Sequence, residues 1–175
     1  MLGAVIADLP PKRKIMKLAE GLAEKKDIQN RIADLHTRFT NAAVIEEGSV
    51  PDEKAAELLL SLEGAMSRME MMTVALNMTN NTVTIVVDNA HLTMMQAIAR
   101  RDNLKMQISQ YDNMVNSIRH RNQNRRHYGE NTPKMVLAEG VDLSYFVKKK
   151  DALSKELRVL DASIQAANWT NDLLL

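Results

Sequence analysis

The fold is decided by the stretch DEKAAELLLSLEGAMSRMEMMTVALNM, residues 52–78. Its apolar side chains recur at alternating four- and three-residue steps, the heptad pattern of a helix that packs on other helices. Further apolar residues widen this stripe, which favours a bundle over a two-stranded coiled coil. Asp52 and Glu53 put negative charge at the expected helix start, where the helix dipole favours it. The stripe consists of Ala55, Leu59, Leu62, Met66, Met69, Thr73 and Leu76, flanked by Leu58, Ala65 and Met72.

Three further segments carry the same period. They lie over about residues 12–39, 93–120 and 142–168, and the first has one irregular step between Leu22 and Ile28. Four such helices favour an all-α fold, an antiparallel four-helix bundle. The expected stripes are Ile15, Leu18, Leu22, Ile28, Ile32, Leu35 and Phe39; then Met94, Ala97, Arg101, Leu104, Ile108, Tyr111, Val115 and Ile118; then Phe146, Lys150, Leu153, Leu157, Leu160, Ile164 and Ala167.

The length of 175 residues fits one domain. Pro10 and Pro11 break the chain, so we expect residues 1–11 to be a tail or extension and residues 12–175 to form a single helical bundle domain. Asp142 is the expected N-cap of the fourth helix, because a side-chain oxygen there can accept a bond from a free backbone amide.

The connections between the helices hold short β signals. Residues 79–92 are rich in Thr, Val and Ile, which favour strands. We expect a short strand at Thr82–Val87, followed by a turn at Asp88-Asn89. The segment Lys134–Ala138 is a candidate second strand beside the first. The prediction is therefore a bundle with one or two short β segments in its connections.

The composition suits helices and excludes several classes of site. Aromatic residues make up only 3%, whereas there are 12 methionines, whose unbranched side chains lose little rotamer freedom in helices. The absence of cysteine excludes disulfides and thiolate metal ligands. No segment approaches the ~20 apolar residues of a membrane span. The N-terminal MLGAVIADLPP lacks the positive flank of a signal peptide, so we expect a cytoplasmic protein.

Charge alternates along the chain. Residues 12–40 and 93–128 are basic overall, whereas residues 41–92 are acidic. We expect neighbouring helices to pair along these flanks. Each exposed pair contributes only ~0–1 kcal/mol, so its value lies in selecting neighbours and register. Lys150 falls on an apolar stripe, where a lysine can extend its stem and keep its ammonium group in water.

The sequence indicates no enzyme. It contains no phosphate-binding glycine loop, no dinucleotide-binding glycine motif and no HExxH zinc motif. None of the four histidines follows a glutamate by three residues, the spacing of di-iron bundles. We therefore predict no catalytic residues, no metal site and no cofactor.

Arg101 is the most informative polar residue, because it falls on the apolar stripe of the third helix. A guanidinium buried there needs an acidic or polar partner. A polar network that fixes register is the favoured interpretation. The alternative is a small-ligand or nucleotide site, formed by Arg100, Arg101, Asp102, Asn80 and Asn168 near one end of the bundle.

A basic patch follows in the segment SIRHRNQNRRHYG, residues 117–129, and consists of Arg119, Arg121, Arg125 and Arg126. It is a candidate contact for phosphate or nucleic acid. The alternative is a solvated helix C-terminus, where positive charge is favoured by the helix dipole. The net charge of only +1 favours this alternative, so we do not expect nucleic acid as a partner.

Several segments in order resemble the septicolysin-like family of small bacterial proteins. They are MKLAEGLAEKKDIQNRI (16–32), NAAVIEEG (41–48), NMTNNT (77–82), LTMMQAIARRDNLKMQI (92–108) and LDASIQAANW (160–169). The resemblance implies an all-helical protein that starts at Met16 and has no established activity. The family name suggests a cytolysin, but no spanning segment or signal peptide supports one.

The favoured function is that of an oligomeric structural or interaction protein. The heptads and the apolar segment Val83–Val87, whose strand edges a monomer would leave uncovered, both predict self-association into a homo-oligomer. Ligand binding around Arg101 and Asn80 is the first alternative, and the cytolysin is the second.

Overall fold

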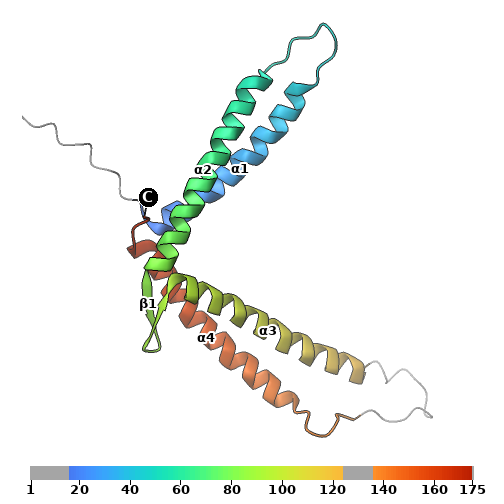
Figure 1. Ribbon diagram of the computed structural model, residues 1–175. Helices are drawn as coiled ribbons and strands as arrows, with labels where there is room; N and C mark the ends of the chain where they lie inside the picture. Colours follow the sequence, from blue (N-terminus) through green and yellow to red (C-terminus); the bar gives the residue numbers. More distant parts are fainter. Residues whose placement is uncertain (1–15, 124–135, 175) are drawn as a thin grey trace, which may run out of the picture. The chain divides into compact units, whose positions relative to one another are not determined.

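The computed structural model describes residues 16–123 and 136–174. Four helices account for most of them: α1 (Leu18–Ala43), α2 (Ala55–Thr82), α3 (Met94–Gln123) and α4 (Leu143–Thr170) (Figure 1). Two short strands, β1 (Thr84–Val87) and β2 (Ala90–Thr93), lie between α2 and α3. The predicted mostly helical fold is therefore confirmed. The expected tail and the expected helix start at Lys12 lie outside the described residues.

The chain divides into two compact units. Unit 1 comprises Met1–Leu76 and Thr170–Leu175, and unit 2 comprises Asn77–Trp169. Each unit is built on one pair of antiparallel helices, α1 with α2 or α3 with α4. The predicted arrangement of all four helices as one bundle is not confirmed, and the single domain over residues 12–175 stays a prediction.

In unit 1, α1 and α2 lie side by side (Figure 1). Their antiparallel direction follows from two ion pairs, Arg38 with Glu53 and Glu24 with Arg68, which pair early residues of one segment with late residues of the other. The pair of Arg38 with Glu53 has the polarity that the charge pattern predicted for the two segments, whereas the pair of Glu24 with Arg68 has the opposite polarity. The core between the two helices consists of Leu35, Leu58, Leu62 and Ala65, with Ile32, Phe39 and Ala42 packed against it.

The irregular step in the first apolar stripe has a structural reason. Leu22 is exposed, whereas the neighbouring Gly21 is buried. Gly21 therefore takes the core position, and the prediction for Leu22 is wrong. A Cβ at this position would lie only 2.8 Å from Cδ2 of Leu173, so the leucine side chain would have to shift to make room for it.

The two ends of the described chain meet beside Gly21. The amide of Leu18 donates to the carbonyl of Asn171 (3.0 Å), and the amide of Leu173 donates to the carbonyl of Met16 (2.8 Å). Lys17 Nζ also pairs with Asp172 Oδ1 at 2.6 Å. This terminal clasp, residues 16–18 with 171–173, closes unit 1 and places the buried Leu173 against α1.

Unit 2 begins with a β-hairpin. β1 and β2 pair antiparallel, with Val87 opposite Ala90. The turn residues Asp88 and Asn89 both have positive φ, 48° and 64°. A two-residue turn of this kind matches the twist of its strands and favours Asn and Asp. The predicted turn is confirmed. The partner strand was predicted wrongly, since 136–138, the described part of the predicted second strand, forms no strand.

The hairpin leads directly into α3. Thr93 Oγ1 accepts a bond from the amide of Gln96 (3.2 Å), and Gln96 Oε1 accepts one from the amide of Thr93 (2.9 Å). This reciprocal pair is a capping box, which satisfies two backbone donors at the helix start. The helix therefore begins at the residue after the strand, and no loop separates them.

The apolar stripes of α3 and α4 are confirmed. Met94, Ala97, Leu104 and Val115 are buried on α3, and the other predicted positions are half-buried. On α4 the buried residues are Leu153, Leu160, Ile164 and Ala167. The two helices are joined by ion pairs of Arg100 with Glu156 and of Lys150 with Asp112, and by the tilted rings of Tyr111 and Phe146.

Lys150 lies on the apolar stripe of α4, but its ammonium group is paired with a carboxylate, whereas the prediction was that it stays in water. Its side chain is partly buried, and its ammonium group reaches Asp112 Oδ1 at 2.8 Å. This hydrogen bond raises the pKa of Lys150 and lowers the pKa of Asp112. Asp142 caps α4 as expected: its Oδ1 accepts a bond from the amide of Ser144 at 2.8 Å. The side-chain bond from Ser144 and then the backbone bond lower the pKa of Asp142.

Candidate interaction site

The helix α2 is apolar on two opposite faces. One face carries the buried residues Leu58, Leu62, Ala65, Met72 and Leu76. Two positions along a helix correspond to about 200° of rotation, so the residues two positions from Leu62, Ala65 and Met72 lie on the opposite side. On this side Leu60, Gly64, Ser67, Met71 and Val74 repeat at four- and three-residue steps and form the outer face of α2, which Glu63 and Glu70 border.

The outer face is open within unit 1. Leu60 is 69% exposed, Met71 54% and Val74 52%. Gly64 and Ser67 are also exposed, and a Cβ added at Gly64 would have no atom within 4 Å. The centre of the face therefore has small side chains, and large apolar side chains stand at both of its ends.

The stripe predicted for this helix was partly wrong. Leu62 and Leu76 are buried as predicted, whereas Leu59 and Met66 are exposed. The flanking residues Leu58 and Met72 occupy the core in their place. A helix with two competing apolar stripes fits more than one heptad assignment, and periodicity cannot choose between them.

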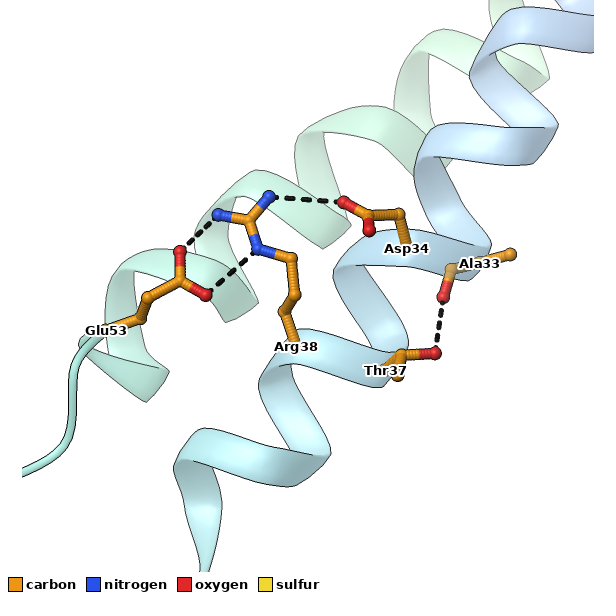
Figure 2. A network of polar contacts seen from close by, with 5 residues as sticks. All are labelled: Ala33, Asp34, Thr37, Arg38 and Glu53. Atoms are coloured by element: carbon orange, nitrogen blue, oxygen red, sulfur yellow. Dashed lines mark hydrogen bonds and ion pairs between the residues drawn. The ribbon is translucent and has the colours of Figure 1, made fainter.

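A polar network lies beside the loop that joins α1 and α2 in unit 1 (Figure 2). Arg38 on α1 forms a bidentate contact with the carboxylate of Glu53. Its Nε donates to Oε2 at 3.0 Å, and its Nη2 donates to Oε1. A third nitrogen of Arg38 donates to Asp34 at 3.2 Å. Glu53 can reach back because α2 starts at Ala55, three residues later than the predicted start at Asp52.

These contacts shift the pKa values of Arg38 and Glu53. The side-chain hydrogen bond with Glu53, followed by that with Asp34, raises the pKa of Arg38. The same bond with Arg38 lowers the pKa of Glu53. Two depressions of about 390 and 470 Å³ share this ion pair as part of their walls. Since Arg38 is occupied by two carboxylates, the network holds the loop and does not offer a free cation.

The Arg38–Glu53 contact predicts a dependence of stability on pH. Because the folded-state pKa of Glu53 is depressed, the contact stabilises fully above its ordinary pKa of 4.5 and is lost as the pH falls through the folded value. The Tm of Glu53→Gln should therefore fall less than the Tm of the native chain when the pH is lowered from about 5 to about 3. The exposed Glu47→Gln serves as control and should keep the native acid sensitivity. Identical pH profiles for the native chain and Glu53→Gln would refute the contact.

The residues predicted around Arg101 are distributed as follows. Arg101 is half-buried and pairs with the adjacent Asp102, both contacts being 2.9 Å. Arg100 bonds Glu156 on α4 at 2.7 and 2.9 Å. Both arginines are thus paired with carboxylates. Asn80 is half-buried on α2 and Asn168 is buried on α4. The ligand site composed of these residues stays a prediction.

The basic patch is described only in part. Arg119 and Arg121 are exposed near the end of α3, whereas Arg125 and Arg126 lie outside the described residues. Arg121 lines a depression of about 330 Å³ together with Met114 and Ile118. Apolar and cationic side chains are therefore adjacent on this end of α3.

Over residues 16–123 and 136–174, no three His, Asp or Glu side chains gather as a metal ion would require. Among the described helices, none combines the length and apolar character needed to cross a membrane.

The outer face of α2 was not among the predicted features, although the sequence contains its pattern. Leu60, Met71 and Val74 stand in the quoted stretch at the same heptad steps as the chosen stripe. The Arg38–Glu53 pair had no comparable signal. It joins residues across a loop, and only the acidic character of the following helix start pointed to it.

Comparison with known proteins gives a family without an assigned function. The matching family model is described as "Family of unknown function (DUF6847)" and covers residues 25–173. No curated protein matches the chain significantly. Among solved structures, a functionally unknown conserved protein from Corynebacterium diphtheriae is similar at 29% identity and a TM-score of 0.78, over 91% of this chain and 99% of that one.

These matches correct the family resemblance drawn from the sequence. The resemblance to the septicolysin-like family is wrong, since the matched family is a different one and nothing in the matches points to a septicolysin. The cytolysin alternative rested on that family name alone and is withdrawn with it. The matches indicate no catalysis.

Proposed function

We propose that this chain, which belongs to the DUF6847 family of unknown function, is a self-associating helical interaction protein that binds a second copy through the outer face of α2. The observation that carries the proposal is the second apolar stripe, Leu60, Gly64, Ser67, Met71 and Val74, which is exposed in unit 1. A helix with apolar side chains on two opposite faces leaves one of them exposed when only the other is covered, and contiguous exposed apolar residues mark interaction sites. A single partner helix, α1, covers only one side.

The chemistry of the outer face suits a helix–helix contact. Full burial of a side chain such as Leu, Met or Val contributes roughly 1.5–3 kcal/mol. Three such residues on each of two copies would offset much of the free energy lost on association. Gly64 and Ser67 carry little bulk, so a partner backbone can approach closely between Leu60 and Met71.

If a second copy binds to this face, the predicted four-helix bundle would form between two copies of the chain. Two α1–α2 pairs, one from each copy, would supply four helices around a core of α2 side chains. An interface that uses the same patch on both copies closes with two-fold symmetry. The proposal therefore joins the bundle and the homo-oligomer, which the sequence analysis predicted separately.

Sedimentation velocity over a range of protein concentrations tests the proposal. We expect the mass to rise from monomer towards dimer with concentration, and the dimer to persist in high salt because the contact is apolar. A chain that stays monomeric from micromolar to millimolar concentration would refute self-association. A fixed mass above the monomer that resists dilution would still support it.

A further inference from the structure

A second surface lies at the loop between α1 and α2, away from the outer face. Val44 and Val50 are 82% and 88% exposed, and Ile45 is exposed as well. Glu46, Glu47 and Asp52 belong to the same loop and are also exposed. The loop surface, residues 44–52, therefore combines exposed apolar side chains with three carboxylates. Its carboxylates are distinct from Glu53, which Arg38 already holds.

The opposite combination occurs at the end of α3. Met114 is exposed and Ile118 half-buried, and together with Arg121 they line the depression of about 330 Å³. Arg119 is exposed one residue beyond Ile118. The α3-end surface, residues 114–121, is therefore apolar with a positive rim. Apolar side chains next to opposite charges make the two surfaces complementary.

We propose that the loop surface of one copy docks on the α3-end surface of a second copy. This inference rests on the self-association proposed above and adds a second contact to it. The contact joins two different surfaces, so it is head-to-tail and can link copies in a series or a ring. Unlike the α2 contact, it depends on charge and should weaken as salt screens it.

Charge reversal of each surface tests the inference in the full-length chain. The loop variant carries Glu46→Lys and Glu47→Lys, and the helix-end variant carries Arg119→Glu and Arg121→Glu. Each should weaken the salt-sensitive association by about tenfold or more at low ionic strength, since attractive pairs become repulsive. Association is measured by sedimentation at about 0.01 M and about 1 M salt.

Mixing the two variants supplies the decisive comparison. The reversed loop and the reversed helix end are again complementary, so the mixture should form a complex that neither variant forms alone. The control Asp27→Lys with Glu139→Lys changes the net charge as the loop variant does, at exposed positions outside both surfaces, and should associate like the native chain.

Two results would overturn the inference. One is native association of both reversed variants at low salt. The other combines two observations: a chain with all four reversals associates like the native chain, but the two variants do not bind each other when mixed. That combination would mean that the two surfaces meet within one chain. Neither result touches the apolar α2 contact. Loss of association in Met71→Glu, with both reversed variants unaffected, would leave the proposed function standing and remove only this inference.

Discussion

Replacing Met71 by glutamate should weaken self-association by at least about 100-fold. A carboxylate placed in an apolar contact without a partner costs several kcal/mol, and each 1.4 kcal/mol is a factor of ten in the dissociation constant. The monomer should remain folded, because Met71 is 54% exposed in unit 1. Glutamate is also nearly as good a helix former as methionine. Sedimentation equilibrium gives the two constants, and circular dichroism checks the helix content.

Gln29→Glu is the matched control for this prediction. Gln29 is exposed on α1 and lies in the same unit, so the substitution adds the same charge away from the outer face of α2. We expect this variant to associate like the native chain. Native association of Met71→Glu, or equal weakening by both substitutions, would contradict an interface on the outer face.

Replacing Leu173 by alanine should destabilise unit 1 by roughly 2–4 kcal/mol, as large-to-small substitutions of a buried leucine do. Leu173 is buried at 6% exposure, and its side chain lies where Gly21 leaves room for it. The substitution would open a cavity next to α1 and loosen the terminal clasp. Urea unfolding measures the change in the free energy of unfolding.

The adjacent Leu174→Ala is the control for the clasp. Leu174 is 44% exposed, so its truncation should change the free energy of unfolding by no more than about 0.5 kcal/mol. Similar losses for Leu173→Ala and Leu174→Ala would show that the packing of Leu173 on Gly21 does not stabilise the unit.

The core positions of α3 and α4 were predictable because their three- and four-residue steps select residues that are buried or half-buried. Met94, Leu104 and Leu160 were predicted in this way, and all three are buried. The turn at Asp88-Asn89 was likewise predictable, since few residues accept positive φ and Asn and Asp are among them.

Other features could not be read from periodicity. In α2 two stripes compete, and only contact with α1 decides that Leu58 is buried and Leu59 is not. The core position of Gly21 depends on Leu173, which lies far away in the sequence and fills the space of the absent side chain. The strand β2 is only four residues long, too short for its alternation to stand out, and its pairing with β1 follows from the short turn.

The candidate site also has parts that the sequence indicates and parts that only the fold determines. Exposed apolar residues such as Leu60 and Val74 are visible in the sequence, but their exposure is a property of the fold. The network of Arg38 with Asp34 and Glu53 joins two segments across a loop, and no local pattern announces such a contact. Arg101 was singled out because of its place on an apolar stripe, yet its partner is simply its neighbour Asp102.

A single cysteine at position 67 tests the α2 contact most directly. The native chain has no cysteine, so Ser67→Cys introduces the only thiol, at the middle of the outer face. In a two-fold contact centred on this face, residue 67 meets its own copy. We expect rapid formation of a disulfide-linked dimer under mild oxidation, and none for Gln29→Cys on α1. A Ser67→Cys chain that stays unlinked, or that links no faster than Gln29→Cys, would contradict the self-association of α2.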